Sequence, residues 1–353
     1  MVRLDFIRRQ SKYTMRIALD VMGGDHAPTA NINGARLAIQ SLPDIQRLYL
    51  VGDEPLLKEN LDNQLIDSGK IEIVHASEVV GMHESPAKAI RRKKHSSISI
   101  ATDLVKDGTC EALVSAGNTG AAVAAATIKL RNLPGVERAG IASAIPNEYG
   151  QCHIIDAGAN PEAKATHLLQ YAIMGSVYSQ HVLGKKSPRI GLMSVGTEAE
   201  KGTDFTREVF TMLKESGLNF IGNIEGHDLF ESKIDVVVCD GFTGNVMLKS
   251  CEATASAMSK WIKQEILKSP LRKLGAILVK PAFKAVMARA SYEEYGGSPL
   301  LGINGTCIIA HGGSSALAIK NALRVAAETV SHRVNPHIEK EIAKLCPSQP
   351  THA

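Results

Sequence analysis

The sequence predicts an α/β fold with a doubly wound, mainly parallel sheet. Short apolar runs rich in β-branched residues alternate with longer segments of helical period. These runs are continuously apolar rather than alternating, which is typical of strands covered by helices on both faces. The chain also has 30 glycines but only 4% aromatic residues, which indicates many tight loops between aliphatic strands and helices.

Each expected element follows from these runs. We expect strands at 15–21, 47–53, 71–76, 111–117, 140–145, 152–158, 189–195 and 234–241, with a further apolar run at 305–310. Residues 314–345 have the pattern of one or two helices that cap the domain. The 353-residue chain is therefore expected to form one large α/β domain over 15–345, with a loose leader over 1–14 and a flexible tail over 346–353.

Composition excludes several classes of protein. The formal net charge of +4 is too small to indicate a nucleic-acid partner. The six cysteines form no CxxC pair, and most lie in apolar runs, as buried thiols in a reducing cytoplasm do. No apolar segment reaches the roughly 20 residues of a membrane span.

Five turns share one character. Residues 21–28, 115–121, 156–164, 194–202 and 239–249 each follow a strand, lead into a helix and combine glycine with Asn, Asp, Thr or Lys. Ligands bind beyond the carboxyl ends of the strands in open α/β sheets. We therefore expect these turns to converge on one site.

The first turn, MGGDHAP, is a candidate anion site. Gly23 and Gly24 would let an anion approach free backbone N–H groups at the start of a helix near Pro28. A strand–Gly-Gly–helix turn is also common for conformational reasons alone. Asp25 and His26 favour a functional role, because a tight turn requires neither and histidine can supply charge or a proton near neutral pH.

Two further turns allow two interpretations each. Asn118 and Thr119 offer amide and hydroxyl donors to a ligand, but either residue would also serve as a helix N-cap. Asp156 and Asn160 are candidates for binding a ligand or for holding a neighbouring loop.

The turn CDGFTGNVMLK is more specific. Asp240, Thr243 and Asn245 lie between a strand and a helix, and Lys249 lies one helical turn beyond Asn245, so that it can project to the same edge.

Lys201 and His311 are weaker candidates. Lys201 shares its loop with two acids and is either a phosphate contact or a solvated charge, whereas His311 stands beside a glycine pair, where a lone histidine is often incidental. HExxH, GxxxxGK[ST], GxSxG, complete GxGxxG and His/Cys metal motifs do not occur, which argues against metallohydrolases, P-loop kinases, serine esterases and dinucleotide fingerprints.

The segment from Lys249 to Arg289 differs from the rest. It contains nine Lys or Arg and two acids, interleaved with apolar residues. We expect basic amphipathic helices that protrude over about 255–290, interrupted at Pro270 and Pro281. This protrusion is suited to a membrane interface or to dimer packing; the candidates for membrane contact are Trp261, Leu274, Ile277 and Phe283.

Taken together, the motifs resemble one family. DVMGGDHAP, RRKKHSS, VSAGNTGA, DAGAN, the GTE…KG loop, VCDGFTGNVMLK and GINGTCIIAHGGSS occur in the order found in the PlsX-type phosphate acyltransferases of bacterial phospholipid synthesis. The resemblance runs from about Met15 to about Val330.

The resemblance implies a Rossmann-like fold related to isopropylmalate dehydrogenase and phosphotransacetylase. It implies transfer of a fatty acyl group from acyl carrier protein to inorganic phosphate, giving acyl phosphate for a downstream glycerol-3-phosphate acyltransferase. It also implies a cytoplasmic homodimer in peripheral contact with the inner face of the cell membrane. No metal or other cofactor is expected.

Roles for individual residues follow from this chemistry as hypotheses. His26, Asp25, Lys201 and Asn245 are the catalytic candidates. The remaining turn residues are candidates for binding phosphate or the thioester: Gly23, Gly24, Asn118, Thr119, Asp156, Asn160, Asp240, Thr243, Lys249 and His311. A basic cluster is the candidate docking site for the acidic carrier protein, although it also suits a solvated helix face: Arg91, Arg92, Lys93 and Lys94.

Other functions remain open from the sequence. A short-acyl phosphotransacetylase or a dehydrogenase of the same architecture would prefer free coenzyme A thioesters or bind a nicotinamide. A non-catalytic scaffold for acyl carrier protein at the membrane would bind the carrier without releasing its thiol in response to phosphate.

Overall fold

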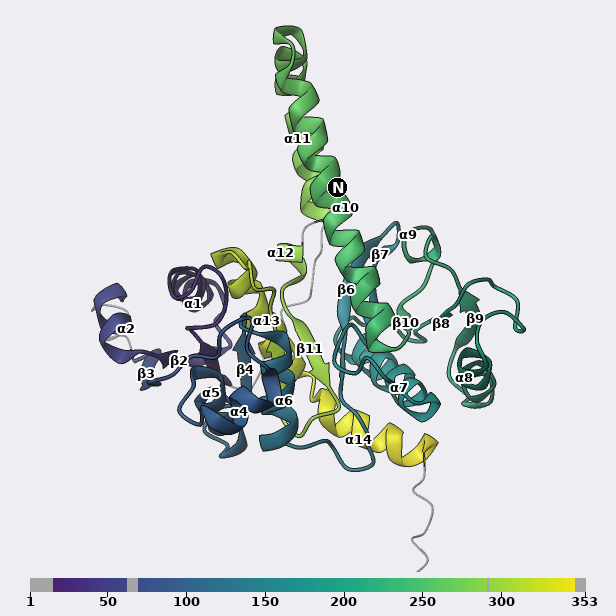
Figure 1. The fold of residues 1–353 in the computed structure, drawn as a ribbon, viewed down its shortest axis with the longest axis horizontal. Coiled ribbons are helices and arrows are strands. Elements are labelled where there is room, and N and C mark those ends of the chain that lie inside the picture. Colours follow the sequence, from purple (N-terminus) through teal and green to yellow (C-terminus); the bar gives the residue numbers. More distant parts are fainter. Residues whose placement is uncertain (1–14, 62–68, 291, 347–353) are drawn as a thin grey trace, which may run out of the picture.

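The computed structural model describes residues 15–61, 69–290 and 292–346. The expected leader and all but the first residue of the expected tail lie outside these ranges. Two sheets stand side by side, and a long helical hairpin projects from between them (Figure 1).

The first sheet has seven strands in the order β3-β2-β1-β4-β12-β11-β5. Five of them are parallel: β1 (Met15–Asp20), β2 (Ile45–Gly52), β3 (Ile71–His75), β4 (Ala112–Ser115) and β12 (Thr306–Ile309). β11 (Ser298–Leu301) pairs antiparallel with β12 and with β5 (Gly140–Ile141). The carboxyl ends of β1, β4 and β12 therefore lie at one edge, next to one another.

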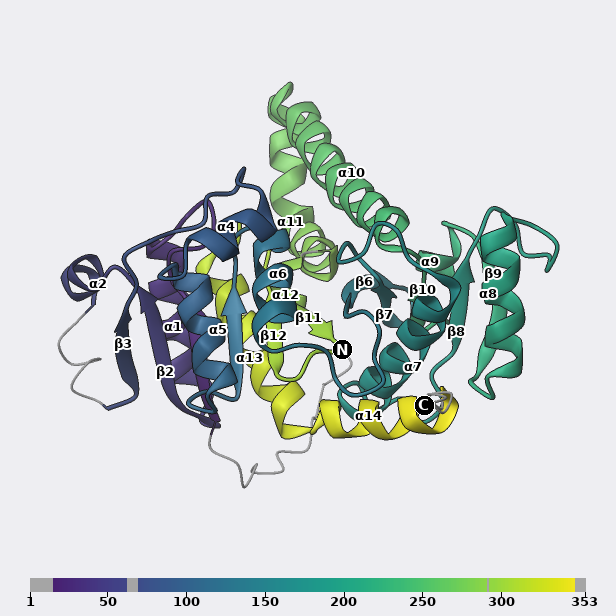
Figure 2. The same ribbon diagram turned by 60° about the horizontal axis from the view of Figure 1, so that its bottom comes forward.

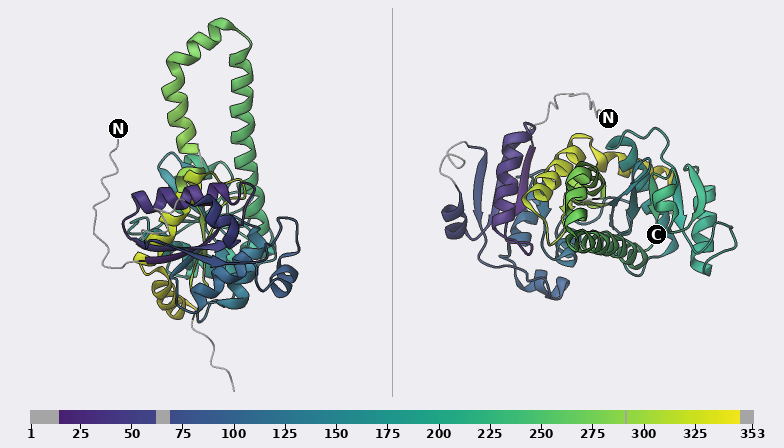
Figure 3. Two further views of the ribbon diagram at one scale, coloured as in Figure 1. Left: turned by 90° about the vertical axis from the view of Figure 1, so that its left-hand side faces the viewer. Right: turned by 90° about the horizontal axis from the view of Figure 1, so that it is seen from above.

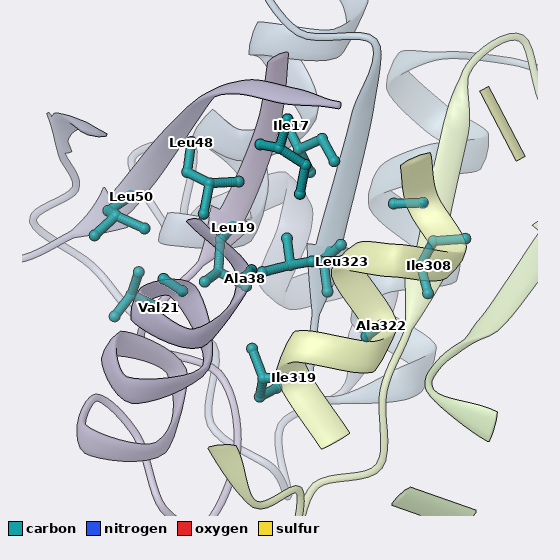
Figure 4. Packing of buried hydrophobic residues seen from close by; sticks show 14 of the residues in the cluster. Ile17, Leu19, Val21, Ala38, Leu48, Leu50, Ile308, Ile319, Ala322 and Leu323 are labelled. Carbon is teal, nitrogen blue, oxygen red and sulfur yellow. The ribbon is translucent and has the colours of Figure 1, made fainter. Parts of the chain in front are cut away.

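Helices cover both faces of this sheet, as the apolar runs predict. One face packs on α1 (Thr29–Ser41) and α13 (Ala316–Ser331), with α2 (Glu54–Asn60) at the margin. Figure 4 shows Ala38 of α1 and Ile319 and Leu323 of α13 around Ile17 and Leu19 of β1. The opposite face packs on α4 (Pro86–Arg92), α5 (Ser97–Lys106) and α6 (Thr119–Lys129).

The second sheet has five strands in the order β6-β7-β10-β8-β9. β7 (Gly150–Ile155), β10 (Val236–Val238), β8 (Ile190–Met193) and β9 (Phe220–Ile224) are parallel, and β6 (Ser143–Asn147) pairs antiparallel with β7. Its helices are α7 (Ala165–His181), α8 (Asp204–Glu215) and the short α9 (Asp228–Glu231). Figure 2 shows α14 (Val334–Leu345) below the second sheet, where it packs on α7; Leu301 of β11 belongs to the same hydrophobic cluster.

The mainly parallel α/β fold is confirmed, but the strands divide into two sheets. The run expected at 140–145 is not one strand: Gly140–Ile141 belongs to the first sheet and Ser143–Asn147 to the second. β9 and β11 were not expected from the sequence. Gly222 and Asn223 in β9 and Pro299 in β11 break the β-branched pattern that marks the other strands.

The hairpin consists of α10 (Gly241–Leu267) and α11 (Pro270–Ala290), followed by α12 (Tyr292–Tyr295). Its two long helices run side by side away from the sheets (Figure 3). α10 has 27 residues, which corresponds to about 40 Å of helix.

The expected interruption at Pro281 is wrong, because α11 continues through it. Proline removes one backbone hydrogen bond, and the remaining bonds keep this exposed helix together. Pro270 does mark a boundary, since α11 starts there. Within the described ranges, no helix has the length and apolarity to cross a bilayer.

Candidate active site

The turn after β1 packs directly on the turn after β4. A Cβ added at Gly23 would lie 2.7 Å from the Gly117 nitrogen and 2.8 Å from Asp20 Oδ2. No larger side chain fits without moving backbone. Glycine at both positions therefore lets the two turns meet at the edge of the sheet.

The same turn is tied to the turn after β12. The Asp25 N–H donates to the Gly312 carbonyl at 2.8 Å. Gly24 has φ +106° and lies against the carbonyls of Ala116 and Gly312, where a Cβ would be 3.1 and 3.0 Å away. Three turns of the first sheet thus form one backbone cluster, as the sequence predicts for strands that end at one edge.

Asp20 lies beneath this cluster at the end of β1. Its Oδ2 accepts from the Ser115 hydroxyl at 2.7 Å, and the same hydroxyl oxygen accepts from the Gly117 N–H at 3.1 Å. Burial raises the pKa of the Asp20 carboxyl, and hydrogen bonds from Ser97 and Ser115 oppose that rise. Asp20 therefore connects the β1 strand to the backbone of the β4 turn.

In the second sheet, Asp156 organises the turn after β7. This fully buried carboxylate accepts from the backbone N–H groups of Ile141, Gly158, Ala159 and Asn160, at 2.6–3.0 Å. Burial raises its pKa, against the effect of these hydrogen bonds. Of the two interpretations, the hydrogen bonds match the loop-holding one, since both oxygens accept from backbone N–H groups.

The Asn160 side chain also acts within the protein. Its amide donates to the Ala139 carbonyl at 2.6 Å and to the Tyr171 hydroxyl at 2.7 Å. These bonds fix the β7 turn to the segment that leads into β5. They hold the two sheets together where their turns are closest.

The start of α10 packs tightly on the β7 turn. A Cβ added at Gly241 would lie 2.6 Å from the Asn160 carbonyl oxygen, and one at Gly244 would lie 2.0 Å from the Asp156 carbonyl oxygen. Asp240 is the N-cap of this helix: its Oδ1 accepts from the Thr243 N–H at 2.9 Å, and its Oδ2 from the Thr243 hydroxyl at 2.7 Å. The two turns form a second backbone cluster, which also carries Asn245 close to Gly158.

A cavity of about 500 Å³ lies between the two sheets. Its volume falls within the roughly 300–1,000 Å³ of small-molecule sites. β12 of the first sheet contributes Ile309, and β6 of the second contributes Ser143 and Ile145. Thr119 at the start of α6 also lines the cavity, and α10 forms a further wall from Asn245 to Met258. Residues from three of the five expected turns line it, in the ranges 115–121, 156–164 and 239–249, whereas none of 21–28 or 194–202 does, so the expected convergence of all five turns is not seen at this cavity.

Charged groups cluster at the end of the cavity nearest the turns. Lys249 Nζ lies 2.8 Å from Glu252 Oε2, and His311 Nε2 lies 3.8 Å from the same oxygen. The His311 Nδ1 accepts from the Gly313 N–H at 3.1 Å, which leaves Nε2 directed toward the carboxylate. Lys249 and His311 come from α10 and from the β12 turn, so this cluster joins the two sheets.

The structure brings some sequence candidates to this cavity and not others. Four of them line it: Thr119, Asn245, Lys249 and His311. Asp25 and His26 are exposed on the β1 turn, beside the 312–313 glycines. Lys201 is exposed in the turn after β8, two strands away from β7, and does not line the cavity.

Asn118 has two structural contacts. Its Oδ1 caps α6 by accepting from the Ala121 N–H at 3.0 Å, and its amide donates to the Met82 carbonyl at 2.9 Å. The second bond attaches the loop before α4 to the β4 turn. The basic cluster lies at the opposite end of α4, and none of its residues lines the cavity.

Within the basic cluster the four residues differ. Arg91, Arg92 and Lys94 are exposed. Lys93 is half-buried, and its ammonium bonds Glu84 at 2.5 Å and the Val79 carbonyl at 2.7 Å. Lys93 is therefore engaged within the protein, whereas the other three present their charge to solvent.

Sequence reasoning missed Glu252 and the apolar wall of α10. Leu248, Cys251, Ala255 and Met258 line the cavity at spacings of three and four residues. This spacing predicts one apolar helical face. The basic residues around it favoured instead an interpretation of the whole segment as a surface for membrane or dimer contact. Glu252 follows Lys249 by three residues, a spacing that brings side chains together on a helix.

No group of three or more metal-binding side chains comes together in residues 15–61, 69–290 and 292–346.

Comparison with known proteins identifies the family of this chain. The sequence model of a family described as "Fatty acid synthesis protein" matches residues 15–337. The chain is 56% identical over 337 residues to a phosphate acyltransferase of Akkermansia muciniphila, covering 94% of this chain and 97% of that protein. It is 49% identical over 331 residues to one of Pelotomaculum thermopropionicum, covering 94% and 96%.

Solved structures share the architecture. A phosphotransacetylase from Streptococcus pyogenes superposes with a TM-score of 0.56 at 18% identity, covering 90% of this chain and 94% of that one. The EutD phosphotransacetylase from Staphylococcus aureus gives 0.54 at 16% identity, covering 92% and 95%. At these identities the likeness concerns the fold alone. The sequence relatives decide the family, and this chain belongs to the phosphate acyltransferases, enzymes of the fatty acid synthesis protein family.

Proposed function

We propose that this enzyme transfers a fatty acyl group from acyl carrier protein to inorganic phosphate. The observation that carries the proposal is the cavity between the sheets: Lys249, His311, Asn245 and Thr119 supply polar groups to its lining, and apolar side chains form much of the rest. A dianion and an acyl chain need these two environments side by side. The acyl phosphate product would supply a downstream glycerol-3-phosphate acyltransferase.

The reaction is a direct displacement. An oxygen of hydrogen phosphate attacks the thioester carbonyl carbon, the C–O bond forms, and the C–S bond breaks. The proton of hydrogen phosphate ends on the carrier thiol, whose pKa near 8.5 makes it a good leaving group. The products are acyl phosphate and free carrier thiol, and no redox change occurs.

The polar residues of the cavity lining suit the two negative charges of the reaction, that of the phosphate and that of the oxyanion formed from the thioester carbonyl. Lys249 and His311 are placed to attract phosphate, and the side chains of Asn245 and Thr119 are donors for the developing oxyanion. His26 and Asp25, on the adjoining turn, are proposed to orient phosphate and move its proton. Lys201, expected from the sequence as a phosphate contact, lies outside this cavity and is given no role in the step.

The test is one assay with palmitoyl carrier protein and phosphate. We expect free thiol and acyl phosphate to appear in equal amounts, at a rate that depends on phosphate. Thiol release without phosphate, or faster turnover of acetyl coenzyme A, would contradict the proposal. Asn245→Ala is expected to lower kcat by roughly 10²-fold, the effect of losing one oxyanion donor.

The basic cluster is proposed to dock the acidic carrier protein. Arg91, Arg92 and Lys94 are exposed, so their charge is available for steering. We expect Arg91→Glu/Arg92→Glu to raise KM for the carrier substrate and to weaken its salt dependence. Lys214→Glu, an exposed position on α8, is the matched control and should leave KM unchanged.

The hairpin is proposed to contact the inner face of the cell membrane and to contribute to a homodimer. Trp261, Leu274 and Ile277 are 61, 62 and 67% exposed, and Phe283 is 40% exposed, among lysines and arginines. In flotation with anionic vesicles, Leu274→Glu/Ile277→Glu should remain in the unbound fraction. A variant that still forms dimers but no longer floats assigns these side chains to lipid, whereas one that floats as a monomer assigns them to the dimer.

A further inference from the structure

The cavity extends well beyond the charged residues at its inner end. β6 lines it from Ser143 to Pro146, and α10 lines it from Asn245 to Met258. On β6, Ser143 pairs with Ile154 near the end of β7, and Pro146 pairs with Gln151 near its start. The cavity therefore runs from the turns back along the sheet, away from the site of phosphate attack.

Its length along α10 is considerable. Asn245 and Met258 are 13 positions apart in the sequence, which is roughly 20 Å along a helix. An acetyl group would occupy only the inner end of such a cavity. The shape suits a long, narrow, flexible ligand.

Much of the lining is apolar. Apolar side chains come from both sheets and from α10, namely Ile141, Ala144, Ile145, Leu248, Ala255 and Ile309, and they alternate with polar ones such as Ser143, Thr254 and Ser298. At the outer end, Phe230 and Met258 are 42 and 52% exposed. Solvent therefore reaches this end of the cavity.

We propose that this cavity binds the fatty acyl chain, with its carbonyl at Asn245 and its methyl end between Phe230 and Met258. Ala144 of β6 and Ala255 of α10 lie on two of its walls, and their small side chains leave room for the chain and set which chain lengths are used. This inference rests on the proposed function, and it adds the location of the chain and the residues that select it.

The preference for long chains follows from burial. Each methylene removed from water strengthens binding about fourfold. Because the outer end is open, chains longer than the cavity are tolerated and short chains lose affinity. Small residues at 144 and 255 are what leave the passage free.

The experiment compares two variants on one helix. Ala255 is half-buried in the cavity wall, whereas Ala253 is exposed and does not line it. Ala255→Phe is expected to lower kcat/KM for palmitoyl carrier protein at least tenfold and to change that for octanoyl carrier protein by less than threefold. Ala253→Phe should keep the wild-type ratio of the two substrates.

A second variant, on another wall of the cavity, and a binding measurement separate an effect on the acyl chain from a folding defect. Ala144→Leu should shift the chain-length ratio in the same direction. The fluorescent C18 fatty acid cis-parinaric acid should bind the wild type and Ala253→Phe, with affinity lost at least fivefold in Ala255→Phe. Equal ratios in Ala255→Phe and Ala253→Phe, with equal parinarate affinity, would overturn the assignment.

The two proposals fail in different ways. If the wild type releases no thiol in response to phosphate with either chain length, the proposed function is wrong, and parinarate binding still tests the cavity. If thiol release depends on phosphate but the ratio of kcat/KM for palmitoyl and octanoyl carrier protein is unchanged by substitutions at Ala144 and Ala255, only the proposed location of the acyl chain is wrong.

Discussion

The two-sheet body and the α10–α11 hairpin follow opposite rules. In the body, apolar side chains are buried and glycines lie where backbones touch, as at Gly244 against the Asp156 carbonyl. In the hairpin, Leu271 and Leu278 are 77 and 80% exposed, and a Cβ at Gly275 would meet nothing within 4 Å. Tight packing in the body positions reacting groups, whereas an apolar surface left open in the hairpin suits an external partner.

The largest contrast is expected from one substitution made in both regions. Gly244→Ala places a Cβ 2.0 Å from the Asp156 carbonyl oxygen, so backbone must shift. We expect a loss of roughly 3 kcal/mol in the free energy of unfolding, together with most of the activity. Gly275→Ala, in open space, should instead stabilise its helix by up to about 1 kcal/mol.

Urea unfolding of the two alanine variants measures this contrast directly. Similar urea midpoints for the two variants would mean that the backbone at the start of α10 shifts at little cost. The turn clusters would then be less rigid than their contacts indicate.

A second contrast appears in acid. His153 of β7 is 4% exposed, and burial lowers its pKa to about 4. Since this folded-state pKa lies below the unfolded value near 6.5, the unfolded chain binds the extra proton. The stability is therefore fully present above pH 6.5 and is lost as pH falls toward 4, with roughly 2 kcal/mol lost between pH 7.5 and 5.

Thermal melts at pH 7.5 and 5 test this assignment. His153→Phe, which keeps a ring against Tyr178, should show a smaller drop in Tm between the two pH values than the wild type. An equal drop would assign the acid sensitivity to other groups.

Much of the body was predictable because strands buried on both faces carry a strong local pattern. Eight of the nine apolar runs became single strands, and only 140–145 was divided. Local sequence does not say which sheet a strand joins: Ile141 and Ser143 are separated by one residue and belong to different sheets. That choice is made by long-range pairing, of Ile141 with Leu300 of β11 and of Ser143 with Ile154 of β7.

At the site, glycine-rich turns marked where to look but not what each side chain does. Asp156, Asn160 and Asn118 have the polar side chains of ligand contacts, yet the structure shows them bonded to neighbouring backbone. Polar residues at strand ends serve both purposes, and only geometry separates them. Glu252 and the cavity wall were not predicted because they lie within helix α10, whereas the site was expected only in the glycine-rich turns that follow the strands.

A smaller effect is expected at the junction of the two regions. Asp240 caps α10, so Asp240→Ala should cost about 1 kcal/mol in the free energy of unfolding. Asp240→Asn keeps a capping acceptor and should recover most of it. If the asparagine variant is as stable as the wild type but less active, the carboxylate has a role beyond capping, and phosphate titration of the reaction rate would show it.

The smallest effect is expected at the tip of the hairpin. Leu278 is 80% exposed, so Leu278→Lys should change the free energy of unfolding by less than about 0.5 kcal/mol in the absence of lipid. Urea midpoints measured across a hundredfold range of protein concentration check this. A loss of unfolding free energy that is large at high protein concentration and vanishes on dilution would mean that a second copy of the chain buries this leucine. The tip of the hairpin would then be assigned to dimer contact rather than to lipid.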